Sequence, residues 1–239
     1  MASNNYANDD DLIYNTSSRI PVCICIDTSG SMWQTDNSNY SRIQRVQHGL
    51  EKFYNEIESN EMTRNSAEIL IVGFSSTPYI IRNFKTYTPG EEQPQLTCHS
   101  KGDMGLGVSE SLQKLIERKD MYKANGIDYY QPWLIIMSDG HSTGDGDVQG
   151  NLKRAQAEVL KLEKENKITV IPVYIGKDLA SDQKAKKELS GFSRKYQPIN
   201  ILDIGFSKFF VWLGKSVSVV NTNEDVQLDF ADLTDWDEI

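Results

Sequence analysis

Hydrophobic runs without polar alternation recur along the chain, and the segments between them carry hydrophobic residues at helical spacing. Strands buried on both faces produce the first pattern, and helices that cover a sheet produce the second. The sequence therefore predicts a doubly wound α/β fold, in which helices flank a mainly parallel central sheet with one antiparallel edge strand. The predicted strands are 20–26, 67–74, 79–84 as the antiparallel edge, 133–137, 168–175 and a brief strand near 198–202.

Helices are predicted between these strands, and one irregular stretch interrupts the alternation. The predicted helices cover 43–57, 104–116, 148–159, 180–190 and 206–220. Pro172 is unusual inside a strand because proline cannot donate a ladder hydrogen bond. The stretch 85–103 has no periodicity, and loops of this kind often carry function.

Charge and composition divide the chain into a polar N-terminal segment (1–18), one domain (19–221) and an acidic tail (222–239). The formal net charge is −9, but seven acidic residues and no basic ones lie in the tail. The tail is expected to be either disordered or a docking segment. Its large hydrophobic residues, including Phe230 and Trp236, favour docking onto a partner or onto a neighbouring copy of the chain.

Several classes of protein are excluded by the same counts. The polar N-terminus does not match a signal peptide, and three cysteines are too few for a secreted disulfide framework. We therefore expect a cytoplasmic protein with reduced thiols, and we expect Cys23 and Cys25 to lie in the core. The sequence contains no run of eighteen apolar residues, so no membrane span is predicted. It also lacks a basic patch, so nucleic-acid binding is not expected.

The segment Asp27-Thr28-Ser29-Gly30-Ser31 directly follows the first buried strand. Ligands of open α/β sheets bind at the carboxyl ends of the strands. Alternate residues of this turn can present one carboxylate and two hydroxyl groups to a common point. Hard oxygen ligands suit Mg²⁺ best here, with Mn²⁺ or Ca²⁺ as alternatives, and do not suit zinc.

Asp139, in the segment Ser138-Asp139-Gly140, follows another predicted buried strand. Either aspartate alone would be read as a turn residue, but together, after two parallel strands, they favour a shared cation. His141 comes next and could line the site, but a solvated loop side chain is the preferred interpretation.

The segments IDTSGSM, IVGFSS and LIIMSDG resemble the von Willebrand factor A domain with its metal-ion-dependent adhesion site. The segments RIPVCICIDTSGSM, PWLIIMSDG and FFVWLGKSVSVVN are similar to its tellurite-resistance-associated bacterial branch, TerY-like. The resemblance covers residues 19–221 and implies a Rossmann-like fold. It also implies a six-coordinate cation bound directly by Ser29 and Ser31, and directly or through water by Asp27 and Asp139.

The family's threonine ligand, in the pattern G-T-x-x-G, has no direct counterpart here. Its place falls on Gly102 or Asp103 in the segment KGDMG. Asp103 could be a third carboxylate ligand of the cation, or it could simply cap the helix that begins at Met104.

The resemblance implies that a partner protein supplies a carboxylate to the open coordination position. We expect aromatic residues to surround the site as a binding surface: Trp33, Tyr40, Tyr129 and Tyr130. Trp133 is expected to cover the sheet instead. The TerY-like branch implies an adaptor or scaffold in a stress-response or defence assembly that contains a protein kinase and a protein phosphatase.

Enzymatic activity is not expected. The alternative is a Mg²⁺-dependent phosphoesterase, since a metal beside Ser29 could support phosphoester hydrolysis. An aspartate nucleophile in such chemistry would want a second carboxylate two residues on, and Ser29 occupies that place. No general base could be assigned either.

Overall fold

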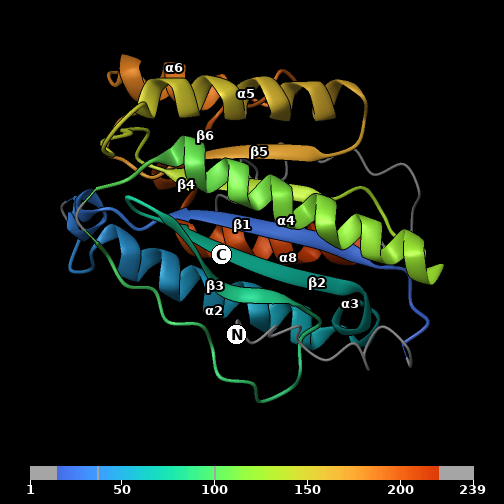
Figure 1. Cartoon of the computed structure of the whole chain (residues 1–239). Coiled ribbons are helices and arrows are strands. Elements are labelled where there is room, and N and C mark those ends of the chain that lie inside the picture. Colours follow the sequence, from blue (N-terminus) through green and yellow to red (C-terminus); the bar gives the residue numbers. More distant parts are fainter. Residues whose placement is uncertain (1–14, 37, 100, 221–239) are drawn as a thin grey trace, which may run out of the picture.

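A six-stranded sheet forms the centre of the protein (Figure 1). The computed structural model describes residues 15–36, 38–99 and 101–220. The strand order is β3-β2-β1-β4-β5-β6, and β2 with β3 is the antiparallel pair. The strands are β1 (Ile20–Asp27), β2 (Ala67–Phe74), β3 (Pro78–Lys85), β4 (Trp133–Ser138), β5 (Thr169–Tyr174) and β6 (Ile199–Asn200).

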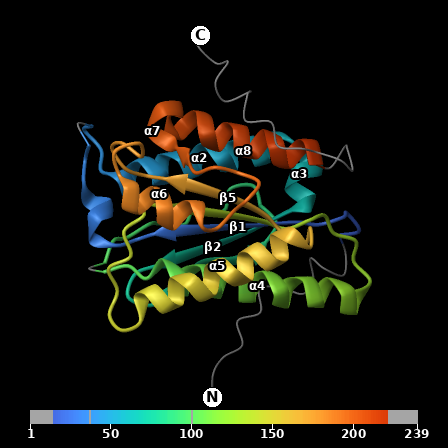
Figure 2. The same ribbon diagram turned by 90° about the horizontal axis from the view of Figure 1, so that it is seen from above.

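Helices cover both faces of this sheet, as the view from above shows (Figure 2). The helices α2 (Arg42–Ser59) and α8 (Phe206–Val220) lie on one face, and α4 (Met104–Asn125) and α5 (Val148–Lys164) lie on the other. The shorter helices are η1 (Gly30–Trp33), α3 (Glu61–Ser66), α6 (Gln183–Ser190) and α7 (Ile201–Ile204). The fold is therefore the doubly wound α/β arrangement that the hydrophobic pattern predicted.

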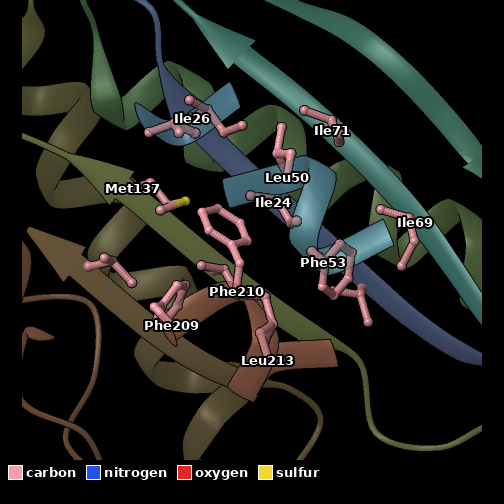
Figure 3. Close-up of a cluster of buried hydrophobic side chains, with 14 of the residues drawn as sticks. Ile24, Ile26, Leu50, Phe53, Ile69, Ile71, Met137, Phe209, Phe210 and Leu213 are labelled. Atoms are coloured by element: carbon pink, nitrogen blue, oxygen red, sulfur yellow. The ribbon is translucent and has the colours of Figure 1, made fainter. Parts of the chain in front are cut away.

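Each face of the sheet has its own hydrophobic cluster. In the cluster below α2 and α8, isoleucines of β1 and β2 meet aromatic and leucine side chains of the two helices (Figure 3). The second cluster lies between the sheet and helices α4, α5 and α6, and it includes Cys23 and Cys25. Both thiols are free and fully buried, and burial raises the pKa of Cys25 to about 12. The prediction that they are core residues is confirmed.

Local sequence signals explain where the main helices begin. Ser41 caps α2 in a capping box, because its side chain accepts from the backbone of Gln44 while the Gln44 side chain accepts from the backbone of Ser41. The backbone N–H of Arg42, the first residue of α2, donates to the carbonyl of Gln34 at 2.8 Å, which joins the start of α2 to the segment after β1.

The six predicted strands are all present, including the one with proline. Pro172 pairs in register with Ile136 of β4, whereas β6 pairs with Val173 and Tyr174. Within the described residues, β5 thus has no strand partner beside Pro172 on its β6 side, and a missing N–H is tolerated there. Trp133 is 4% exposed and covers the sheet as expected.

The sequence patterns did not predict η1, α3 or α7, which are six residues or shorter. Within the described ranges, no helix combines the length and the apolar character needed to cross a membrane.

Candidate metal centre

The loops that follow β1 and β4 meet at one edge of the sheet. β1 ends at Asp27 and the neighbouring parallel strand β4 ends at Ser138. After β1 the chain continues to α2 on one face, and after β4 it continues to α5 on the other (Figure 2). This reversal is the topological switch point at which open α/β sheets bind ligands.

Asp27 is the last residue of β1 at this edge and is 2% exposed. Its Oδ1 accepts a hydrogen bond from the backbone N–H of Ser29 at 2.8 Å, and its Oδ2 accepts one from the hydroxyl of Ser138 at 2.7 Å. The carboxylate is therefore held in one orientation by a group from each of the two strand ends.

The hydroxyl oxygens of Ser29 and Ser31 lie 3.0 Å apart. In an octahedral site with metal–oxygen distances of about 2.1 Å, adjacent ligand oxygens are about 3.0 Å apart. The spacing of the two hydroxyl groups thus suits two adjacent ligands of a Mg²⁺-like ion.

Asp139 is the second buried carboxylate of this edge, at 3% exposure. Its Oδ1 accepts from the backbone N–H of His141 at 3.2 Å, and its Oδ2 accepts from Nη1 of Arg42 at 3.2 Å. Gly140 between them has a φ of +78°, a conformation that glycine adopts without steric penalty. The turn after β4 therefore directs Asp139 toward the turn after β1.

The two carboxylates repel one another electrostatically. Burial, and then the charge of Asp139, raise the pKa of Asp27 from 3.8 to about 6, against the lowering effect of the hydrogen bonds from Ser29 and Ser138. A cation placed between the two carboxylates would stabilise their ionised forms, because its positive charge offsets both the cost of burial and their mutual repulsion. The donor set, the hydroxyl spacing and the excess negative charge all fit a hard divalent ion.

A cavity of about 590 Å³ opens beside these groups. Ser29, Ser31 and Asp139 form part of its wall together with Arg42, and side chains of the loop after β5 line the other side. A molecule entering this cavity would reach the candidate cation position from solvent.

The sequence of residues 22–142 matches the family model described as the von Willebrand factor type A domain, which is just over half of the 239-residue chain. The chain belongs to the von Willebrand factor type A domain family. No curated protein matches this sequence.

Solved structures with the same fold are distant in sequence. The vWF domain of the type V pili tip protein Mfa5 from Porphyromonas gingivalis has 13% identity and a TM-score of 0.59, and the match covers 88% of this chain and 99% of that one. BatB, a conserved hypothetical protein from Bacteroides thetaiotaomicron, has 12% identity, a TM-score of 0.53 and coverage of 85% and 100%.

The PilB minor pilin from Streptococcus sanguinis has 13% identity and a TM-score of 0.56, and the match covers 86% of this chain. This chain spans about three fifths of the pilin's length, with 61% of the pilin covered. These likenesses show a shared fold.

Asp103 occupies the N-cap of α4 in this von Willebrand A domain. Its Oδ1 accepts from the backbone N–H of Leu106 at 3.0 Å, and its Oδ2 accepts from the amide of Asn151 at 2.7 Å. These contacts favour the capping interpretation over the ligand interpretation, both of which the sequence had left open.

Gly102, at the other candidate position for the family threonine, lies against the centre. A Cβ atom there would be 3.0 Å from Cβ of Ser29 and 3.4 Å from Oδ1 of Asp27. The backbone N–H of Gly102 donates to the hydroxyl of Thr143 at 3.3 Å, and Thr143 also lines the cavity. If Gly102 occupies the position of the family threonine, this chain has only backbone atoms next to the site at that position.

The aromatic residues predicted to surround the site are divided between the two edges of the sheet. Trp33 and Tyr40 lie in the segment after β1 and are 59% and 51% exposed. The expectation that Tyr129 and Tyr130 line the same rim is wrong, because Tyr129 bridges Arg19 at the amino end of β1. Residues that precede a parallel strand lie at the edge opposite its carboxyl end. Phe230 and Trp236 fall outside the described residues.

Arg42 was not found by sequence reasoning, and His141 was considered for the site but expected to be a solvated loop side chain. His141 is not simply solvated, because its Nε2 lies 2.6 Å from Oδ2 of Asp182 and its side chain lines the cavity. Arg42 reaches Asp139 across 97 positions of sequence. No rule of sequence spacing could have paired Arg42 with Asp139. The one local signal in the sequence was a helix start near Arg42, after the turn that follows β1. Within the described ranges, no group of three or more His, Cys, Asp or Glu residues lies close enough to hold a metal, so any cation here depends on hydroxyl groups as well.

Proposed function

We propose that this von Willebrand A domain is a metal-dependent protein-interaction module. Asp27, Ser29, Ser31 and Asp139 would hold one divalent cation, with Mg²⁺ as the ion and Mn²⁺ or Ca²⁺ as substitutes. The observation that carries the proposal is the convergence of two buried carboxylates and two hydroxyl groups 3.0 Å apart at the switch point of the sheet.

The bound ion would supply a positive charge that attracts a carboxylate oxygen of a partner protein. The chain's own residues would do the rest. Ser138 and the backbone of Ser29 orient the Asp27 carboxylate, and the backbone of His141 orients Asp139. Little rearrangement would then be needed when the ion binds.

The partner would contact the surface around the cavity. Trp33 and Tyr40 provide large exposed aromatic groups on the segment after β1, and such side chains are enriched in binding hot spots. Tyr129, Tyr130, Phe230 and Trp236 remain candidates for a separate contact, because the first two lie at the far edge of the sheet. Asp103, which could supply a third carboxylate, remains a candidate ligand despite its capping contacts.

The wider role follows from the sequence resemblance to the TerY-like branch. We propose a cytoplasmic adaptor or scaffold in a bacterial stress-response assembly of the tellurite-resistance type, or in a defence system, with a kinase and a phosphatase among its components. Self-association through the acidic tail is a second mode of contact that its sequence supports. Binding, not catalysis, is the proposed activity, because Ser29 stands where a phosphoesterase would want its second carboxylate.

The test is a pull-down from native lysate with wild-type protein and Asp27→Ala, each with and without EDTA. We expect one set of partners to be captured by untreated wild type and lost in the other three samples. Asp120→Ala, which removes an exposed carboxylate of α4, is the matched control and should keep those partners. Identical partners in every sample would contradict metal-dependent binding. Hydrolysis of a generic phosphate monoester by the purified Mg²⁺-loaded protein, lost in Asp27→Ala, would favour the phosphoesterase instead.

A further inference from the structure

An arginine side chain is built into the candidate centre. Arg42 begins α2, and its side chain is 8% exposed. Its Nη1 donates to Oδ2 of Asp139 at 3.2 Å, and it lines the cavity beside Ser29 and Ser31. One of the two carboxylates proposed to hold a cation is thus already paired with a positive charge.

Asp36 fixes this arginine in place. Nη2 of Arg42 donates to Oδ1 of Asp36 at 2.7 Å and Nε donates to Oδ2, so the pair is bidentate. Asp36 has a φ of +45°, and its Oδ2 also accepts from Nη2 of Arg45 at 3.1 Å. A guanidinium held by two parallel hydrogen bonds on one edge has its remaining nitrogen directed to a defined point, and here that point is Asp139.

The arginine changes the net charge that this edge of the sheet would carry once a cation is bound. Asp27 and Asp139 together carry two negative charges when ionised, which a divalent cation alone would neutralise. Asp36, Arg42 and Arg45 together add one positive charge beside these carboxylates, because both arginines are always protonated, so the same cation would leave one net positive charge at this edge. Repulsion between the guanidinium and the cation opposes metal binding, whereas the net charge left after binding attracts an anion.

We propose that Arg42 is a specificity-determining residue that weakens the affinity of the centre for its divalent ion and strengthens the affinity of the loaded centre for a carboxylate. This inference rests on the proposed function. Without metal, Arg42 serves as the counter-ion of Asp139. With metal, its charge adds to that of the ion, and the loaded centre selects an acidic partner more strongly.

The first test compares Mn²⁺ affinity by calorimetry in wild type, Arg42→Gln and Arg45→Gln. Arg45 is the matched control, because it also pairs with Asp36 but, among the residues that the structure describes, forms no ion pair with Asp139. We expect Arg42→Gln to bind Mn²⁺ about tenfold more tightly than wild type, and Arg45→Gln to stay within about twofold. Equal or weaker binding by Arg42→Gln would overturn the proposal.

The second test uses acetate as the carboxylate probe, followed by water-proton relaxation of the Mn²⁺-loaded proteins. Acetate should bind more weakly to loaded Arg42→Gln than to loaded wild type, and equal or tighter binding would overturn this half of the proposal. If Arg42→Gln is poorly folded, Arg42→Met, which removes the charge but keeps a long side chain, takes its place and should move both affinities in the same directions. No change in either affinity for Arg42→Met would then overturn the role of Arg42.

The role of Arg42 and the metal-dependent function can be tested separately. Mn²⁺ binding by wild type that is lost in Asp27→Ala but unchanged in Arg42→Gln would leave the proposed function standing and remove the role of Arg42. Absence of Mn²⁺ binding in wild type, Arg42→Gln and Asp27→Ala alike would remove the metal-dependent function itself.

Discussion

Replacing Asp27 with alanine should lower the affinity for Mn²⁺ by about 100-fold or more. Asp27 is buried at the strand end, is oriented by hydrogen bonds from Ser29 and Ser138, and lies close enough to Asp139 for their charges to interact. The substitution removes a proposed ligand and half of the negative charge that would attract the ion. Calorimetric titration of the purified proteins measures the change directly.

The same substitution should leave the domain folded, because alanine is small and the neighbouring Ser138 hydroxyl still has the backbone N–H of Gly140 as a partner. Circular dichroism and the melting temperature in EDTA check this point. Asp120→Ala removes an exposed carboxylate from α4 and should bind Mn²⁺ as wild type does. Full Mn²⁺ affinity in a folded Asp27→Ala protein would show that the ion, if any, binds elsewhere.

The second large effect is on stability without metal. In EDTA, the free energy of unfolding of wild type relative to Asp27→Asn should fall by about 2 kcal/mol as the pH rises from about 4 to about 7. The pKa of Asp27 is raised to about 6 in the folded protein from 3.8, mainly by burial and then by Asp139. Between these values the folded state binds more protons than the unfolded state, so deprotonation destabilises the fold as the pH increases.

Urea denaturation at several pH values measures this difference. The comparison with Asp27→Asn is needed because other carboxylates, such as that of Asp36 beside Arg42, have lowered pKa values and contribute in the opposite direction. Saturating Mn²⁺ should reverse the loss in wild type and have little effect on Asp27→Asn. A stability difference between wild type and Asp27→Asn that stays constant across this pH range would contradict the raised pKa of the buried Asp27 carboxyl.

Much of the fold could be predicted from the sequence, because burial on both faces leaves a strong signal. All eight residues of β1 and of β2 are buried, which matches their mainly hydrophobic runs; the buried exception within β2, Glu68, pairs with Arg118. The turn at Asp27 and the turn at Asp139 could be placed on one edge because the carboxyl ends of parallel strands share an edge. Short helices such as α3 have too few residues for a periodic pattern to show.

The parts of the site that could not be predicted depend on three-dimensional direction and reach. Tyr129 was assigned to the wrong edge because nearness to a strand in sequence does not say which end of that strand a residue occupies. The sequence placed Arg42 at a helix start but could not pair it with Asp139, since its long side chain reaches Asp139 only once α2 packs beside the turn after β1. The pairing of His141 with Asp182 likewise joins two separate loops.

Anomalous scattering from crystals of the wild-type protein grown with Mn²⁺ tests the central claim most directly. The account predicts one Mn²⁺ peak at the carboxyl ends of β1 and β4, bounded by Asp27, Ser29, Ser31 and Asp139. Interpretable density for these side chains with no peak between them, at a Mn²⁺ concentration in the millimolar range, would contradict it.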